Sequence, residues 1–168
     1  MIKQVSFNWV LEDTSQTREL QSGLSQNEFA GNRQVFFAQV EEEKNLGYEV
    51  IDSFVCFSLK YERKVSPWFW TKVKHTDAPQ YLVNIIGTDM AYDTISIDPE
   101  ESDSLAKRFL ALFAVPLDHI SFYSNFGWDS DRGVANSSGF GVTGATFDRL
   151  VIGLTRNRIG FILAEDED

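Results

Sequence analysis

The clearest pattern of hydrophobic and polar positions lies near the C-terminus of the chain. Two apolar runs, 145–154 and 159–163, flank a polar corner at 155–158. Short apolar runs on either side of a polar corner are typical of a β-hairpin. We therefore predict a C-terminal hairpin with buried apolar side chains. We expect the acidic residues 165–168 after it to be solvated and dispensable for folding.

Other segments also have strand-like patterns. Residues 2–11 alternate between an apolar face with Phe7 and Trp9 and a polar face, which predicts a half-buried strand. Residues 48–62 are apolar on both faces near their middle, as in a central strand covered on both sides. Short apolar runs bounded by turn residues predict the remaining strands, at 68–74, 80–86, 92–97 and 119–123.

Two segments have helical patterns. Residues 32–47 have a partial apolar face and end in Gly47, and glycine often follows the last turn of a helix. The second predicted helix begins at Asp98, a favourable N-cap, and Pro99 fits its first position. Its apolar stripe follows helical spacing and consists of Leu105, Phe109, Leu112 and Phe113.

Two further segments are dominated by polar residues and glycine. Residues 12–31 predict a loop or a weak short helix, because their apolar residues are sparse. Residues 125–144 form the longest predicted irregular segment. Connections of more than about 12–15 residues are uncommon and often functional, so this loop is a candidate cover for a site.

Consecutive strands with separate helices predict an α+β fold with a mainly antiparallel sheet, two main helices and the C-terminal hairpin. The length of 168 residues predicts a single globular domain spanning 1–168. The hydrophobic content of 43% and aromatic content of 14% exclude an intrinsically disordered chain.

Cysteine usage and hydropathy predict a cytoplasmic protein. Cys56 is the single cysteine, so no internal disulfide can form. The N-terminal residues lack the pattern of a secretory signal, and no apolar run approaches the ~20 residues needed to cross a bilayer.

One formal motif is present, and its context argues against it. Gly139, Gly141 and Gly144 spell G-x-G-x-x-G, which binds dinucleotides when a strand precedes it and a helix follows it. Here polar residues precede the glycines and a predicted strand follows them. Since a helix N-terminus is what holds the pyrophosphate, the motif predicts a flexible loop.

Metal and catalytic signatures also fail. Residues 129–133 have the aspartate spacing that begins a calcium loop. However, Val134 stands where that loop needs glycine and Phe140 where it needs glutamate, so we predict a turn. Two histidines and one cysteine give no zinc spacing. The sequence therefore predicts no catalytic residue, no metal and no cofactor.

Charge gives the main functional indication. The chain has 25 acidic and 15 basic residues, a formal net charge of −10. This opposes direct binding to nucleic-acid phosphates and to anionic membranes, and favours encounter with a basic protein. The acidic residues are also segregated, with seven and no lysine or arginine between positions 77 and 103 and four more at the C-terminus.

If strand ends and the start of the second helix meet at one rim, these residues would form a negative face. We expect Trp68, Trp70 or Trp128 near it. The candidate partner-binding residues are Asp89, Asp93, Glu100, Asp103, Asp129, Asp131, Glu165, Asp166, Glu167 and Asp168.

We therefore predict a non-catalytic acidic protein-binding module. In type it resembles the immunity proteins and antitoxins that neutralise basic toxin domains, many of them nucleases. One alternative is a small enzyme or ligand-binding domain with a site under residues 125–144, where Asp129, Asp131 and His119 are the residues to test. A second alternative is a self-associating assembly subunit.

Overall fold

The structure is a computed structural model that describes residues 6–26, 31–41, 47–60 and 70–167. The elements of these residues are α1 (Ser15–Leu24), β1 (Asn32–Gln39), α2 (Tyr48–Leu59), β2 (Thr71–Val73), α3 (Ala78–Gly87), β3 (Thr88–Asp89), β4 (Thr94–Ile95), α4 (Pro99–Ala111), the 3-10 helix η3 (Leu117–His119), β5 (Ser121–Ser124), β6 (Phe126–Asp129), β7 (Val134–Gly139), β8 (Phe147–Leu154) and β9 (Arg158–Asp166).

A five-stranded antiparallel sheet is the centre of the molecule, with strand order β1-β9-β8-β5-β2. The predicted C-terminal hairpin is confirmed as β8 and β9. It is longer than predicted, because β9 continues through Glu165 to Asp166 and pairs there with Phe147. The α+β class with a mainly antiparallel sheet is confirmed.

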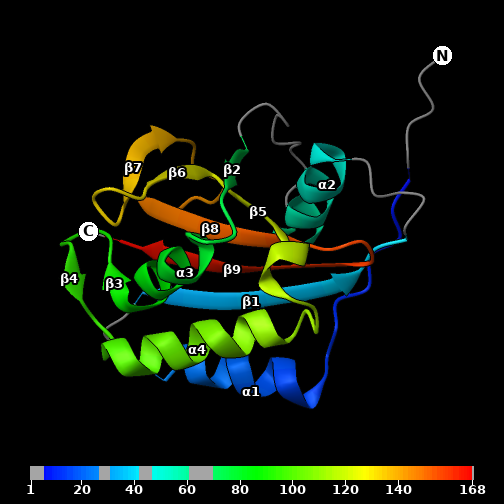
Figure 1. The fold of residues 1–168 in the computed structure, drawn as a ribbon, viewed down its shortest axis with the longest axis horizontal. Coiled ribbons are helices and arrows are strands. Elements are labelled where there is room, and N and C mark those ends of the chain that lie inside the picture. Colours follow the sequence, from blue (N-terminus) through cyan, green and yellow to red (C-terminus); the bar gives the residue numbers. More distant parts are fainter. Residues whose placement is uncertain (1–5, 27–30, 42–46, 61–69, 168) are drawn as a thin grey trace.

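Helices cover both faces of this sheet (Figure 1). Helices α1, α3 and α4 pack on one face, where Val151 and Ile162 point into their core. Helix α2 packs on the other face, against Leu150, Ile152 and Phe161. The alternation of side chains along β8 and β9 therefore supplies two apolar cores, one on each side.

Three predicted elements have the opposite type. The predicted helix 32–47 is strand β1 in its described part, the predicted strand 48–62 begins with helix α2, and the predicted strand 80–86 lies within helix α3. In α2 the buried residues Val50, Ile51, Phe54 and Val55 follow helical spacing. Gly47 is the N-cap of this helix and has a left-handed φ of 64°.

The described residues form four α-helices, two more than the two main helices predicted. Helix α4 is the predicted helix that is confirmed, and the Asp98 carboxylate caps it by accepting from the Glu100 amide. Helix α1 is the short helix allowed for in 12–31. Thr14 and Thr17 form its capping box, in which each side chain accepts from the backbone amide of the other residue.

The N-terminal strand prediction is wrong for residues 6–11, which are irregular; residues 2–5 lie outside the described part. Phe7 stacks on Trp9 at 5.3 Å, and the Trp9 indole donates to Ser53 of α2. These contacts, rather than strand pairing, hold the segment.

The remaining strand predictions are confirmed in shortened form. Strand β2 covers part of 68–74, β4 covers part of 92–97 and β5 begins within 119–123. The segment 125–144 is not wholly irregular, because it contains the paired strands β6 and β7. In the described part of the chain, none of the helices has the length and apolar character needed to span a bilayer.

Candidate protein-interaction surface

Four acidic segments meet at one end of the molecule. They are the β3–β4 hairpin, the first turns of α4, the β6–β7 turn and the last residues of β9 (Figure 1). Thr88, Ile95, Pro99 and Gly133, from the first three segments, line one pocket. We name this region the acidic end and define it by its carboxylate residues: Asp89, Asp93, Glu100, Asp103, Asp129, Asp131, Glu165 and Glu167.

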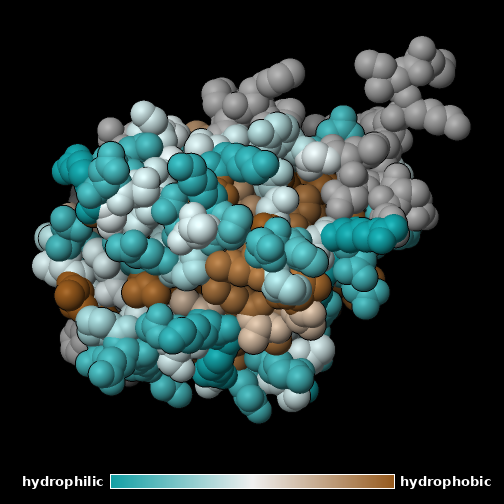
Figure 2. Space-filling view, viewed as in Figure 1, coloured by the Kyte–Doolittle hydropathy of each residue, from teal (hydrophilic) through white to brown (hydrophobic). Residues whose placement is uncertain are grey.

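Figure 2 shows hydrophilic residues over most of this end, with small apolar areas among them. The predicted negative face required strand ends and the start of the second predicted helix to meet at one rim, and they do meet here. Asp168, the remaining predicted residue apart from Asp166, lies outside the described part of the chain.

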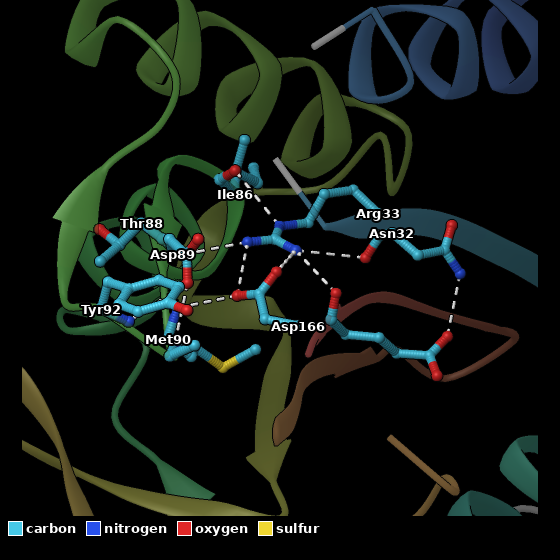
Figure 3. Close-up of polar contacts among 10 residues, drawn as sticks. Asn32, Arg33, Ile86, Thr88, Asp89, Met90, Tyr92 and Asp166 are labelled. Carbon is cyan, nitrogen blue, oxygen red and sulfur yellow. Dashed lines mark hydrogen bonds and ion pairs between the residues drawn. The ribbon is translucent and has the colours of Figure 1, made fainter. Parts of the chain in front are cut away.

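A buried ion pair fixes the acidic end to the sheet (Figure 3). The Arg33 guanidinium on β1 donates to both carboxylate oxygens of Asp166 on β9, at 2.7 and 3.1 Å. The two side chains are 0% and 2% exposed. Asp166 is therefore not a solvated tail residue, and we expect the fold to depend on it, because a buried charge needs its partner.

The remaining donors of Arg33 connect the sheet edge to α3 and the β3–β4 hairpin. They donate to the backbone carbonyls of Ile86 and Thr88, as well as to those of Asn32 and Glu165. Asp166 in turn accepts from the Met90 amide at 2.8 Å. One buried pair thus ties the start of β1, the end of β9 and the hairpin together.

The β3–β4 hairpin holds two exposed apolar side chains at the acidic end. Asp89 accepts from the Ala91 and Tyr92 amides and so forms the turn. Asp93 has a left-handed φ of 52°, a conformation that aspartate tolerates better than most residues. As a result Tyr92 and Ile95 project into solvent, 67% and 72% exposed.

The other predicted acidic residues differ in the hydrogen bonds and ion pairs that they form. Asp129 forms its turn by accepting from the Asp131 and Arg132 amides, so the predicted turn at 129–133 is present. Asp103 pairs with Lys107 one helical turn along α4. Glu165 accepts from Asn32, and Glu167 accepts from Thr146. These groups remain at the surface.

The aromatic residues near the acidic end differ from those predicted. Trp70 is 4% exposed in the core on the α2 side and donates to Asp52. Trp128 stacks on Tyr81 at 4.7 Å and is only partly exposed, while Trp68 lies outside the described residues. Tyr92 is the aromatic side chain that the acidic end presents to solvent.

A second buried carboxylate explains the glycine motif. Asp148 on β8 is 4% exposed and accepts from the Val142 and Thr143 amides and from the Thr143 hydroxyl. Asn125 donates to Asp148 from the opposite side. Two amides of the glycine segment that could bind a phosphate thus already donate to an anion of the protein itself.

The residues of the enzyme alternative do not form one cluster. His119 and Asp118 lie on η3, not on a strand, with both side chains about two-thirds exposed and 3.9 Å between their charged atoms. Asp129 accepts from the amides of its own turn, and Asp131 is exposed on the same turn. Among the residues that the structure describes, no group of three or more His, Cys, Asp or Glu could hold a metal ion.

Comparisons with protein-family models, with curated proteins and with solved structures found no match to this chain.

Sequence reasoning missed Arg33, Asp148, Tyr92 and Ile95. Arg33 was assigned to a helix, so its place opposite the C-terminal strand could not be seen. A signal for Tyr92 and Ile95 was present, because the short run 92–97 itself contains polar residues, Asp93, Thr94 and Ser96. Such a strand cannot bury both of its faces.

Proposed function

We propose that this protein is a non-catalytic acidic binding module that neutralises a basic protein partner by direct contact through the acidic end. The partner is a toxin-like domain, with a nuclease the best match, because a nuclease carries a basic groove for phosphate. Carboxylates of the acidic end would occupy that groove. Since Cys56 is its one cysteine, the protein suits a reducing cytoplasm.

One observation carries this proposal. Segments separated by up to about half of the chain bring their carboxylates to one end, and several of these carboxylates have no basic side chain as a partner among the described residues. Among the described residues, Asp89, Asp93, Glu100, Asp129 and Asp131 take part in no salt bridge. Uncompensated charge of one sign raises the association rate with a partner of the opposite sign.

The exposed apolar residues support a protein partner over a small ion. Tyr92 and Ile95 stand within the acidic end, and interfaces commonly combine a few aromatic or aliphatic anchors with a polar rim. A purely solubilising acidic surface has no need for them.

The test is affinity capture from native lysate with the wild-type protein and with the triple variant Asp93→Asn, Glu100→Gln, Asp131→Asn. A matched control removes three exposed acidic groups elsewhere: Asp13→Asn, Glu49→Gln, Asp118→Asn. The wild type and the control should retain a basic partner that the acidic-end variant loses. Mass spectrometry identifies that partner.

Two measurements then separate neutralisation from simple binding. Expression of the captured partner alone should arrest growth, and co-expression of the wild-type protein should restore it. The association rate of the purified pair should fall steeply between low and high salt. A partner that binds all three proteins equally, or with a rate that does not depend on salt, contradicts the proposal.

A further inference from the structure

A small pocket opens at the centre of the acidic end, between α3, the β3–β4 hairpin, the start of α4 and the β6–β7 turn. Its volume is about 180 Å³. Its apolar lining comes from Val83, Ile95, Ile97 and Pro99, and two amide side chains, Gln80 and Asn84, complete its wall.

Close backbone approaches set the walls of this pocket. At Gly87 a β-carbon would lie 2.3 Å from the Ser102 hydroxyl, so glycine lets α3 and α4 meet. Gly133 has a left-handed φ of 65°, and a β-carbon there would lie 3.0 Å from the Gln80 amide nitrogen. The pocket therefore depends on packed elements and not on one side-chain rotamer.

Size and charge together define the occupant. Pockets for drug-sized ligands span roughly 300–1,000 Å³, so this pocket fits a single side chain better than a nucleotide or a metabolite. Three of the segments that line the pocket also carry carboxylates: Asp89 follows Thr88, Asp98 and Glu100 flank Pro99, and the turn with Gly133 contains Asp129 and Asp131. An apolar lining supplied by segments that also carry negative charge suits a side chain with an apolar stem and a cationic head.

We propose that this pocket receives one arginine side chain of the basic partner, an inference that rests on the proposed function. Arginine packs its methylene stem on apolar surface while its head stays polar, and its planar group donates to several acceptors at once. The stem lies along Ile95 and Ile97, and the guanidinium faces the carboxylates and the Gln80 and Asn84 amides. Arg132 is a basic residue next to the pocket and is exposed on the β6–β7 turn. The carboxylates of the same segments outnumber it, so the local charge stays negative.

The test uses the full protein and a defined probe, the capped peptide Gly-Gly-Arg-Gly-Gly. In ¹⁵N-resolved NMR titrations, the peptide should shift the amide signals of Gly87, Thr88 and Gly133 in a saturable way. The peptide with citrulline in place of arginine has nearly the same shape without the charge. It should bind at least about tenfold more weakly, the effect of losing a charge-assisted hydrogen bond of about 1.4 kcal/mol. The lysine peptide should fall between the two.

Two variants test the position of the site. Gln80→Phe places a ring at the mouth of the pocket and should abolish the shifts, and its own spectrum reports whether it folds. Ile95→Ser changes a side chain that is 72% exposed, so it should fold normally while weakening the arginine peptide severalfold. Equal binding of the arginine and citrulline peptides, or shifts that survive in both variants, overturns the inference.

The outcome is separable from that of the proposed function. If a basic partner is captured with steep salt dependence but the arginine peptide does not shift the pocket signals, the pocket inference fails alone. If the peptide binds the pocket and the acidic-end triple variant still captures every partner, the pocket stands and the proposed neutralising role fails.

Discussion

Arg33 and Asp166 lie 133 positions apart in the sequence and form a two-point ion pair that is almost completely buried. Each further donor of the guanidinium has a backbone carbonyl as acceptor. The pair joins the first strand of the sheet to the last one. It also supports the hairpin that carries Tyr92, because Asp166 accepts from the Met90 amide.

Asp166→Asn should destabilise the protein by about 3–5 kcal/mol, because it leaves the Arg33 charge buried without its partner. Urea denaturation followed by circular dichroism measures this as a lower transition midpoint. Asp93→Asn is the matched control. It removes an exposed carboxylate from the same end and should change stability by no more than about 0.5 kcal/mol.

Truncation tests the same relationship in another way. A chain ending after Asp166 should keep most of the wild-type stability, whereas a chain ending after Ala164 should lose as much as Asp166→Asn or more. Equal stability of the two truncated chains would show that the ion pair does not hold this end of the sheet.

Asp148→Ala should release the turn at residues 140–145 and leave Asn125 without one of its acceptors. Removing a buried carboxylate that accepts several hydrogen bonds costs about 2–4 kcal/mol, since each lost bond to a charged group is worth about 1.5–3 kcal/mol and the effects overlap. Hydrogen exchange should show lost protection at the Val142 and Thr143 amides, which donate to Asp148. Unchanged protection at these two amides would contradict the role of Asp148.

The confirmed elements are those with local signals in the sequence. The β8–β9 hairpin has a polar corner between apolar runs, and α4 has Asp98 as its cap and Pro99 in its first turn. Both signals lie within a few residues of the structure that they determine. Neither depends on what the rest of the chain does.

The elements that were predicted with the opposite type lack such local signals. In α2, Val50, Ile51, Phe54 and Val55 lie on one helical face, but a strand would place the same residues on both of its faces. Strand β1 is covered on both sides, so polar alternation is absent there as well. Only the pairing of β1 with β9 across eight residues shows that this segment is a strand and not a helix. That pairing is a long-range contact.

The candidate surface was predictable only in part, because only some of its features have local signals in the sequence. The excess of acidic residues between positions 77 and 103 is visible in the sequence, and so is their proximity to the start of α4. The burial of Asp166 is not visible, because its partner on β1 is distant in the chain. Nor does the sequence show that the β6–β7 turn reaches the same pocket as Ile95 and Pro99.

Stability should decrease at alkaline pH because of Tyr81. Burial raises the pKa of the Tyr81 hydroxyl, although its hydrogen bond with Ser124 and the charge of Arg149 act in the opposite direction. In the unfolded chain tyrosine loses its proton near pH 10, while folded Tyr81 still holds it. The unfolded state then binds fewer protons, so the free energy of unfolding falls as pH rises above about 10.

Tyr81→Phe separates this effect from other alkaline changes. The variant should be less stable near neutral pH by about 0.5–1.5 kcal/mol, because the hydroxyl interacts with Ser124 and donates to the Phe126 carbonyl. Between about pH 9 and pH 11 its stability should fall less steeply than that of the wild type. Some decline should remain, since burial also raises the pKa of Tyr123. Parallel curves for the two proteins would rule out Tyr81 as the source.

Tyr92 and the exposed carboxylates should affect different rate constants of the partner complex. Tyr92 is 67% exposed and lies on a turn that Asp89 holds in place, so its ring is available to a partner without rearrangement. Tyr92→Ala should therefore increase the dissociation rate by tenfold or more, equivalent to about 1.4 kcal/mol or more, as for an aromatic anchor at an interface. Surface plasmon resonance with the captured partner measures both constants.

The triple variant Asp93→Asn, Glu100→Gln, Asp131→Asn should mainly lower the association rate and its salt dependence, because charges at the rim of an interface act on encounter. Tyr92→Phe, which keeps the ring, is the control for the anchor and should behave almost as the wild type. If Tyr92→Ala changes only the association rate, the ring does not contact the partner, and the β3–β4 hairpin contributes through its carboxylates alone.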